Sequence, residues 1–304
     1  MTKIIVALGE LLWDLLPGGK VLGGAPANFI FRINSFGDSG QLITRIGNDL
    51  LGKEALAVVR NLNLSDDNIQ IDQVFPTGTV DIVLDEKGIP DYTIHKEVAY
   101  DYLELTAASM ALARQANCIC FGSLIQRSGR ARETIRRLIR EADHAIRFFD
   151  INLRKDCYSS EVITESLKLT NILKINDEEL FSLKKMFRLQ SESLKDLSAE
   201  LIEKFDLEII LVTLGEKGAF VVAKTGDYHY DPGYRVKLGD TVGSGDACSA
   251  GFIHQLMNGQ SLEESLKFGN AAGAKVATTL GGTQVIGKKE IIDFMNEAHE
   301  RISL

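Results

Sequence analysis

The stretch DTVGSGDACSAGF, residues 240–252, places two glycines around a serine and puts an aspartate directly before a run of small residues. Small residues allow consecutive backbone N–H groups to converge on one point. The following residues, 246–257, are predicted to form a helix, whose dipole adds positive potential at that point. We therefore expect an anion site at Gly243, Ser244 and Gly245, with Asp246 beside it.

Better-known glycine motifs do not fit this stretch. A P-loop would continue with Gly-Lys-Ser/Thr, which is missing here. A nucleophile elbow would have glycine two residues before Ser244, where Val242 stands. Cys248 occupies the last glycine position of a dinucleotide fingerprint, so an oxidoreductase is the least favoured class of enzyme.

Two roles remain open for Asp246 at this point. As an ordinary N-cap of the predicted helix it would contribute about 1 kcal/mol to stability. Beside an anion site, its carboxylate could instead accept the proton of an attacking hydroxyl while the backbone amides hold the developing charge. The stretch alone does not decide between the two.

Composition limits the possible partners. The chain has 304 residues, 45% hydrophobic and 25% charged, with a net charge of -8, so nucleic acid is not an expected partner and an anionic substrate needs a locally positive site. The four cysteines form neither a metal motif nor a disulfide framework, and Cys118 and Cys120 are expected on one face of a buried strand. No uncharged apolar run reaches the roughly 18 residues of a membrane span. We expect a cytoplasmic protein without a membrane partner.

Short β-rich runs alternate with helical stretches along the chain. This pattern predicts a mostly parallel sheet covered on both faces. The expected strands are 4–8, 40–47, 117–123, 146–153, 171–176 and 207–215, and the expected helices include 26–37, 52–63, 129–142 and 177–187.

Residues 77–95 break this alternation. Two alternating runs flank DEKG, which predicts an antiparallel hairpin. A hairpin inserted early in a parallel α/β fold could form a substrate lid or a dimer surface, or it could be a peripheral excursion. The sequence leaves these possibilities open.

A second polar group follows the first strand. Asp14 comes after this strand, Gly23 and Gly24 come at the next turn, and Asn28 lies in the next helix. A carboxylate and an amide that converge past a strand end suit a polyhydroxy ligand, because Asp accepts from hydroxyls and Asn both donates and accepts. Ordinary turn chemistry explains the same residue types.

Three further signals are weaker. Asn176 and Glu179 have the spacing of a capping box, and the same spacing could place them near a hydrated Mg²⁺. Thr213 and Gly215 are predicted in a strand-to-strand turn. Arg154, in FDINLR, could face a phosphate or simply lie on the surface.

Taken in this order, these stretches resemble the ribokinase-like (PfkB-type) family of carbohydrate kinases over nearly the whole chain. DTVGSGD is similar to the family signature D-T-x-G-[AS]-G-D, GGAPANF to its glycine–asparagine motif, NDEE to its N-x-x-E element and VTLGEKGA to its T-x-G turn. The resemblance implies an α/β fold of three α/β/α layers with a mostly parallel central sheet and a small β lid. It also implies a single kinase domain over 1–304, with the lid formed by residues of about 11–25 and 77–100.

The resemblance also implies roles for the candidate residues. Asp246 would be the catalytic base, and its N–H would join those of Gly243, Ser244 and Gly245 in a hole for the γ-phosphate of ATP. Asp14, Gly24 and Asn28 would bind the sugar, and Arg154 would approach the phosphates or the sugar. Asn176 and Glu179 would organise Mg²⁺ through water. The nucleotide would be bound by Thr213, Gly215, Asn270 and Ala274.

Two more features follow from the resemblance. Many members hold a monovalent cation such as K⁺ beside the anion hole, and the corresponding backbone carbonyls here belong to Asp240, Val242, Val276 and Gly281. The segment TTLGGTQVIG, 278–287, departs from the most familiar sequence of that site. The lid often pairs between subunits, which implies a homodimer.

The substrate implied by the resemblance is D-fructose. GELLWD, GGAPANF and DINLR are similar to stretches of bacterial fructokinases, which make fructose 6-phosphate from ATP. The alternatives are a kinase of the same fold acting on ribose, a nucleoside or 2-keto-3-deoxygluconate, and a sugar-binding regulatory protein without turnover. The intact Asp246 and GSG sequence argue against the regulatory protein.

Overall fold

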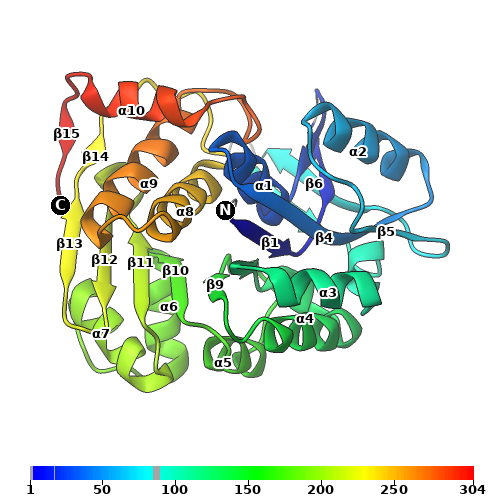
Figure 1. The fold of residues 1–304 in the computed structure, drawn as a ribbon, viewed down its shortest axis with the longest axis horizontal. Coiled ribbons are helices and arrows are strands. Elements are labelled where there is room, and N and C mark those ends of the chain that lie inside the picture. Colours follow the sequence, from blue (N-terminus) through cyan, green and yellow to red (C-terminus); the bar gives the residue numbers. More distant parts are fainter. Residues whose placement is uncertain (1–2, 17, 85–89) are drawn as a thin grey trace.

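The structure is a computed structural model that describes residues 3–16, 18–84 and 90–304. Within these residues the largest sheet has nine strands in the order β13-β12-β11-β10-β9-β8-β1-β4-β5 (Figure 1). From β11 to β5 all neighbouring strands are parallel, whereas β12 and β13 are antiparallel additions at one edge. The strands are β1 (Ile4–Leu8), β4 (Ser39–Gly47), β5 (Ile69–Asp72), β8 (Cys118–Phe121), β9 (Ile146–Asp150), β10 (Ile172–Asn176), β11 (Ile209–Thr213), β12 (Ala219–Ala223) and β13 (Tyr228–Asp231).

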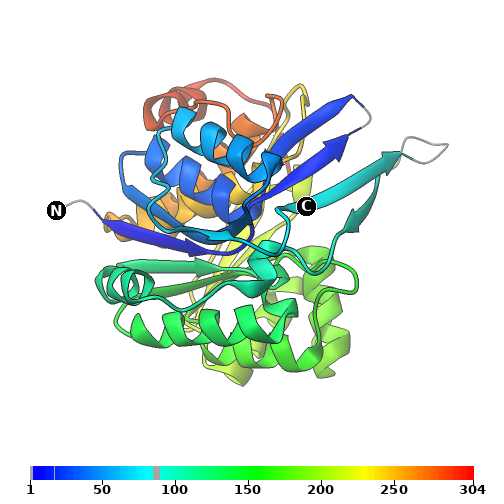
Figure 2. The same cartoon turned by 90° about the vertical axis from the view of Figure 1, so that its right-hand side faces the viewer.

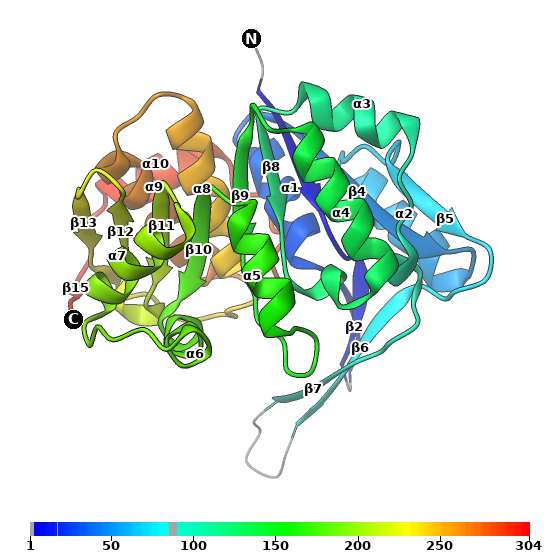
Figure 3. The same ribbon diagram turned by 90° about the horizontal axis from the view of Figure 1, so that it is seen from below.

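Helices cover both faces of this sheet (Figures 1 and 3). One layer holds α3 (Ala107–Gln115), α4 (Gly129–Glu141), α5 (Ser160–Lys168), α6 (Asp177–Phe187) and α7 (Leu194–Phe205). The other layer holds α1 (Ala25–Ser35), α2 (Leu50–Asn61), α8 (Ser244–Met257), α9 (Leu262–Val276) and α10 (Lys288–Asn296). Short elements complete the fold: η1 (Ala99–Tyr102), η2 (Leu124–Arg127), η3 (Gly215–Lys217), β14 (Gly233–Tyr234) and β15 (Arg301–Ile302).

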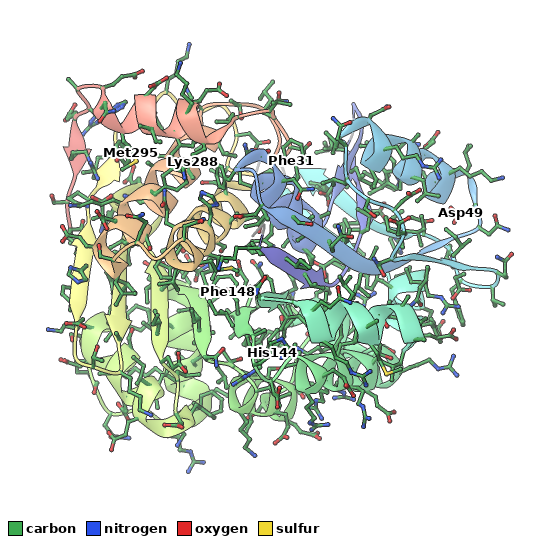
Figure 4. All side chains as sticks on the ribbon, viewed as in Figure 1. Phe31, Asp49, His144, Phe148, Lys288 and Met295 are labelled. Atoms are coloured by element: carbon green, nitrogen blue, oxygen red, sulfur yellow. The ribbon has the colours of Figure 1, made fainter. Side chains whose placement is uncertain are left out.

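Strand residues alternate between two hydrophobic cores, one beneath each helix layer. In β8, Ile119 and Phe121 belong to the core under α3–α7, and Cys118 and Cys120 to the core under α1, α8 and α9. This confirms the shared face expected for the two cysteines. In β9, Phe148 points into the second core, where it stacks on α1 and lies inside the molecule (Figure 4). Because both faces are covered, interior strands such as β1 and β8 are apolar throughout, as parallel strands often are.

The predicted strands and helices are present, with shifted ends. The strand predicted over 146–153 already ends at Asp150, because the chain turns into a loop in which Asn152 has a positive φ of 41°. The strand predicted over 207–215 is β11, and it is followed by β12 across the predicted turn at Thr213 and Gly215.

A second sheet projects from the body (Figures 2 and 3). Its order is β3-β2-β6-β7, formed by β2 (Leu12–Leu16), β3 (Gly19–Gly23), β6 (Gly78–Leu84) and β7 (Pro90–Ile94). β6 and β7 pair antiparallel, as predicted for the hairpin, whose DEKG turn lies outside the described residues. The two segments expected to form the lid therefore pair in one sheet, through a parallel contact between β2 and β6.

Asp49 anchors the residue that precedes strand β6 of this small sheet. It caps α2, where its Oδ1 accepts from the Gly52 amide at 2.7 Å and from the Thr77 hydroxyl at 2.7 Å. Its Oδ2 accepts from the Thr77 amide at 2.8 Å, one residue before β6 begins. One carboxylate thus serves three donors from two separate segments.

No helix among the described residues combines the length and the apolar character that a membrane crossing needs.

We predict that Asp49→Ala lowers the free energy of unfolding by about 2–3 kcal/mol, because it removes a helix cap and two hydrogen bonds to Thr77. Urea titration followed by circular dichroism measures this. The matched control is Ser193→Ala, which removes an N-cap that accepts from one backbone amide and should cost about 1 kcal/mol. Equal losses in the two variants would contradict the anchoring role.

Candidate active site

The first turn after β1 is built around glycine. Gly24 has a φ of 117°, a conformation that other residues rarely adopt, and a β-carbon there would clash with the carbonyl oxygen of Glu10. A β-carbon at Gly23 would likewise overlap the carboxylate of Asp14. The turn, β2 and the start of α1 are thereby packed together, which places Asp14 on the small sheet close to the first turn of α1.

Asn28 links this turn to the other end of the chain. Its Nδ2 donates to Oδ2 of Asp246 at 2.9 Å, and its side chain is buried. Space for the contact depends on Gly282, whose β-carbon would meet the Asn28 amide at 3.1 Å. Gly243 packs against the backbone of Gly282 and has a φ of 75°. Two predicted site residues, Asn28 and Asp246, are therefore in direct contact.

The start of α8 presents unused donors. Gly243 is its N-cap, and the helix runs for 14 residues. The amides of Gly243, Gly245 and Asp246 donate to no acceptor in the described part of the chain, while that of Ser244 donates to Thr241 at 3.2 Å. The Ser244 hydroxyl donates to the carbonyl of Gly273 at 2.9 Å and so ties the turn to α9. Three unused amides at a helix N-terminus suit an anion.

Burial raises the pKa of both acidic candidates. The pKa of Asp246 rises to about 6, first because of burial and then because of the negative charge of Asp150, although Asn28, Lys174 and Arg154 oppose the rise. The pKa of Asp14 also rises to about 6 through burial, and Arg154 limits this rise. Both carboxylates are therefore ionised at neutral pH, with Asp246 basic enough to accept a proton from a hydroxyl during a reaction.

Arg154 is exposed and faces a group of carboxylates. Its positive charge acts on the carboxyl groups of Asp14, Asp246 and buried Glu10. Burial raises the pKa of all three, and Arg154 opposes this rise. The structure therefore brings Asp14, Arg154 and Asp246 into one neighbourhood. A ligand bound there would meet both carboxylates and a cation.

Asn176 and Glu179 form the capping box that their spacing suggested. The Asn176 side chain accepts from the Glu179 amide at 2.7 Å, and Oε2 of Glu179 accepts from the Asn176 amide at 3.0 Å. Oε1 of Glu179 accepts from the amide of Leu153, next to Arg154, at 2.8 Å. Each carboxylate oxygen keeps a second lone pair, so contact with Mg²⁺ through water fits these residues better than direct ligation. No group of three or more acidic, His or Cys side chains that could hold a metal occurs among the described residues.

The residues expected at the nucleotide lie around a different segment. Gly215 opens η3, and Gly218 at its end packs against the backbone of Asp231 to Gly233. Asn270 of α9 donates to Oδ2 of Asp231 at 2.6 Å and to the carbonyl of Pro232 at 2.9 Å. The turn at η3 and helix α9 therefore both contact residues 231–233. Thr213 ends β11, and half-buried Ala274 lies one helical turn beyond Asn270. The Asn270 amide already serves these structural contacts.

Of the four residues expected to bind a monovalent cation through backbone carbonyls, three are linked by hydrogen bonds. Oδ1 of Asp240 accepts from the Val242 amide at 3.0 Å and Oδ2 from the Gly281 amide at 3.3 Å, so these three residues lie together. The carbonyl of Val276 already accepts from the amide of Thr279 at 2.9 Å and from its hydroxyl at 2.8 Å. Since a carbonyl has two lone pairs, Val276 fits a cation least well.

Some charged neighbours of the site were not predicted. Asp150, Lys174 and Glu10 are buried beside Asp246, and the sequence interpretation gave them no role. The signal that could have found them is a charged residue within or just after an apolar strand, as in IRFFD, NILKIN and IIVALGE. Such residues are rarely buried without a partner.

Comparisons with known proteins give a consistent result. Residues 18–288 match the family described as pfkB family carbohydrate kinase. Fructokinase-1 of Oryza sativa is 27% identical over 327 residues, covering 98% of this chain and 99% of the relative. A fructokinase from Xylella fastidiosa with bound ATP superposes with a TM-score of 0.86 at 21% identity, covering 97% of this chain and 98% of that one. A double-mutant fructokinase from Vibrio cholerae with bound fructose, ADP and potassium gives a TM-score of 0.82 at 21% identity, covering 97% and 99%. These matches confirm the predicted fold class.

We predict that Asp246→Asn makes the folded protein more stable at pH 8 by about 1–2 kcal/mol, a figure reduced for the partial exposure of the side chain. Because the pKa of Asp246 is raised in the folded protein, ionising this carboxyl lowers the stability of the folded state. The stability gained by Asn therefore shrinks as pH falls through about 6, and it vanishes below 3.8, the pKa of the carboxyl in the unfolded chain. Urea unfolding at pH 8 and pH 5 measures the difference. Asp143→Asn, at a side chain 87% exposed, is the control and should change neither value. An advantage that is equal at both pH values would contradict the prediction.

Proposed function

The chain belongs to the pfkB family of carbohydrate kinases, and on that basis we propose that it transfers the γ-phosphate of ATP to D-fructose, forming fructose 6-phosphate. The observation that carries the proposal is the contact of Asn28 with Asp246 beside three unused amides at the start of α8. It combines a base, a polar partner and an anion cradle at one point. The similarity over nearly full length to a fructokinase of Oryza sativa favours fructose as the acceptor.

In this proposal the acceptor sugar lies between the small sheet and the body. Asp14 and Asn28 hold hydroxyls, and the backbone of Gly24 allows the sugar to approach closely. Asp14 accepts from hydroxyls as a carboxylate, whereas Asn28 both donates and accepts. Arg154 faces the sugar or the transferred phosphate from the opposite side.

Phosphoryl transfer then needs one proton acceptor and one anion hole. Asp246 takes the proton of the attacking sugar hydroxyl, whose oxygen forms a bond to the γ-phosphorus while the bond from phosphorus to the β–γ bridging oxygen breaks and ADP leaves. The N–H groups of Gly243, Ser244, Gly245 and Asp246 stabilise the charge on the transferred group. The amide of Ser244 would have to exchange its contact with Thr241 for the phosphate.

The nucleotide site is proposed around Thr213, Gly215, Asn270 and Ala274, with Asn270 shaping the wall through Asp231 rather than using its amide on the base. Asn176 and Glu179 would hold Mg²⁺ through water, and the ion would neutralise phosphate charge. Bound ATP in the relative from Xylella fastidiosa supports the nucleotide. Bound potassium in the Vibrio cholerae enzyme supports a K⁺ site formed by Asp240, Val242 and Gly281, with Val276 the weakest ligand.

We further propose that the small sheet is a lid within a single domain and that it pairs in a homodimer. Its described strands expose large apolar side chains: Leu16 and Val21 are 42% exposed and Tyr92 is 57% exposed. Closure would exclude water, which competes for the phosphoryl group. A cytoplasmic location accords with four cysteines that are all free.

Activity against a panel of acceptors tests the proposed function. We expect ATP- and Mg²⁺-dependent ADP release with fructose, and little with ribose, 2-keto-3-deoxygluconate or adenosine. Asp246→Asn should retain sugar affinity while kcat falls about 10²–10⁴-fold, the usual effect of losing a general base. Selective turnover of another acceptor would overturn fructose alone. Sugar binding without turnover of any acceptor would instead favour a regulatory protein.

We predict that Asp14→Asn raises the KM for fructose by about 10–100-fold with a smaller change in kcat, because a charged hydrogen bond made in both ground and transition states is weakened. The wild-type KM should rise in the same way as pH falls through about 6, where Asp14 becomes protonated. Initial rates between pH 5 and pH 8 measure both effects. The control is Asp81→Asn on the neighbouring strand β6 of the same sheet. An unchanged KM in Asp14→Asn would remove this residue from the sugar site.

A further inference from the structure

A buried ion pair lies behind the anion turn. Nζ of Lys174 in β10 is 3.0 Å from Oδ1 of Asp150 at the end of β9, and the two residues are 5% and 6% exposed. Oδ2 of Asp150 accepts from the hydroxyl of Ser249 at 2.8 Å. Ser249 follows Asp246 by three residues in α8, so the pair is attached to the same face of the helix that presents the anion site.

Lys174 lies directly against the glycine turn. Its Nζ is 3.3 Å from the place where a β-carbon of Gly245 would be, so a side chain at that position would press on the ammonium group. Of its three N–H donors, one is used by Asp150 in the described part of the chain. Burial alone would lower the pKa of Lys174, but the charges of Asp150, Glu179 and Asp246 raise it, so the group stays positive.

We propose that Lys174 is a positioning residue for the reaction centre. It supplies a buried positive charge behind Gly245 and Asp246, and Asp150 holds this charge in place by pairing with it directly. The catalytic meaning of the pair rests on the proposed kinase function. Its electrostatic effect on Asp246 does not, because that effect exists in the protein without ligands.

The two members of the pair act on Asp246 in opposite directions. Negative Asp150 raises the pKa of Asp246 and positive Lys174 lowers it. The groups that face Asp246 from the surrounding elements are Glu10 after β1, Cys120 in β8, Asp150 at the end of β9, Arg154 in the following loop and Lys174 in β10. Of these, only Asp150 and Lys174 are joined as a pair among the described contacts.

A purely structural pair would behave differently. Removing either partner of a buried ion pair destabilises a protein, because a charge is left without compensation. Such a loss has the same sign for both partners. An electrostatic role requires instead that the titration of Asp246 moves to lower pH when Asp150 is neutralised and to higher pH when Lys174 is neutralised.

The test is the titration of the Asp246 carboxyl in the full chain without sugar or nucleotide. Protein labelled with ¹³C at aspartate carboxyls is titrated by NMR, and Asp246→Asn assigns the resonance by its disappearance. We expect the midpoint to fall by roughly one pH unit in Asp150→Asn and to rise by a similar amount in Lys174→Met. Ser249→Ala removes a hydrogen bond but no charge, so its midpoint should stay near that of the wild type.

Shifts in the same direction, or no shift in either variant, would overturn the proposal. If Lys174→Met does not fold, the neutral pair Asp150→Asn/Lys174→Met replaces it, and its midpoint must lie above that of Asp150→Asn alone. The readout needs no turnover, so a chain inactive on every sugar would contradict the proposed function and leave this result standing. In an active enzyme, we expect the acid limb of the kcat profile to move with the NMR midpoint, and Lys174→Met to lower kcat about tenfold with little change in sugar KM.

Discussion

The site depends on one hydrogen bond between residues 218 positions apart, from the amide of Asn28 to the carboxylate of Asp246. It joins the first turn of α1 to the first turn of α8, so the N-terminal and C-terminal motifs of the chain meet in one place. The approach is possible because Gly282 and Gly243 pack backbone against backbone beside it. A larger residue at either glycine would separate the two helix ends.

This arrangement concentrates charge where it is costly to bury. Asp150 and Glu10 each lie close enough to Asp246 for their charges to interact with it, and burial raises the pKa of Asp246 and Glu10. Lys174 and Arg154 oppose the accumulated negative charge, from inside the sheet and from the exposed loop respectively. The two hydrophobic cores on either side of the sheet tolerate this cost, as is common where a reactive site is set into a stable scaffold. The cost is also useful, because a carboxylate that is reluctant to ionise is a better proton acceptor at neutral pH.

The sequence predicted the fold class, and it pointed to Asn28 and Asp246, which the structure brings into contact, for a physical reason. Residues such as Gly24, Asn28 and Asp246 belong to short motifs whose local geometry is set by glycine turns and helix starts, and local geometry can be inferred from sequence. The contacts of Lys174 with Asp150 could not be inferred, since they depend on the order of β9 and β10 in the sheet and on side-chain direction. Asn270 shows the same limit. The resemblance assigned it to the nucleotide site, but its bonds to Asp231 and Pro232 arise from how α9 packs on β13.

In the proposed function, the acceptor side of the site is a composite of two parts, the small sheet and the body. Asp14 stands on β2 of that sheet, while Asn28 and Asp246 belong to helices packed on the body. The contacts between the sheet and the body include the glycine-rich turn around Gly24, the contact of Asp49 with Thr77, and the hydrogen bond from Nε1 of Trp13 to the carbonyl of Leu51 at 2.9 Å. Any rotation of the sheet about these attachments changes the distance between Asp14 and Asp246. The glycine turn at Gly24 and the contact of Asp49 with Thr77 therefore hold the fold together and also limit how Asp14 can approach Asp246.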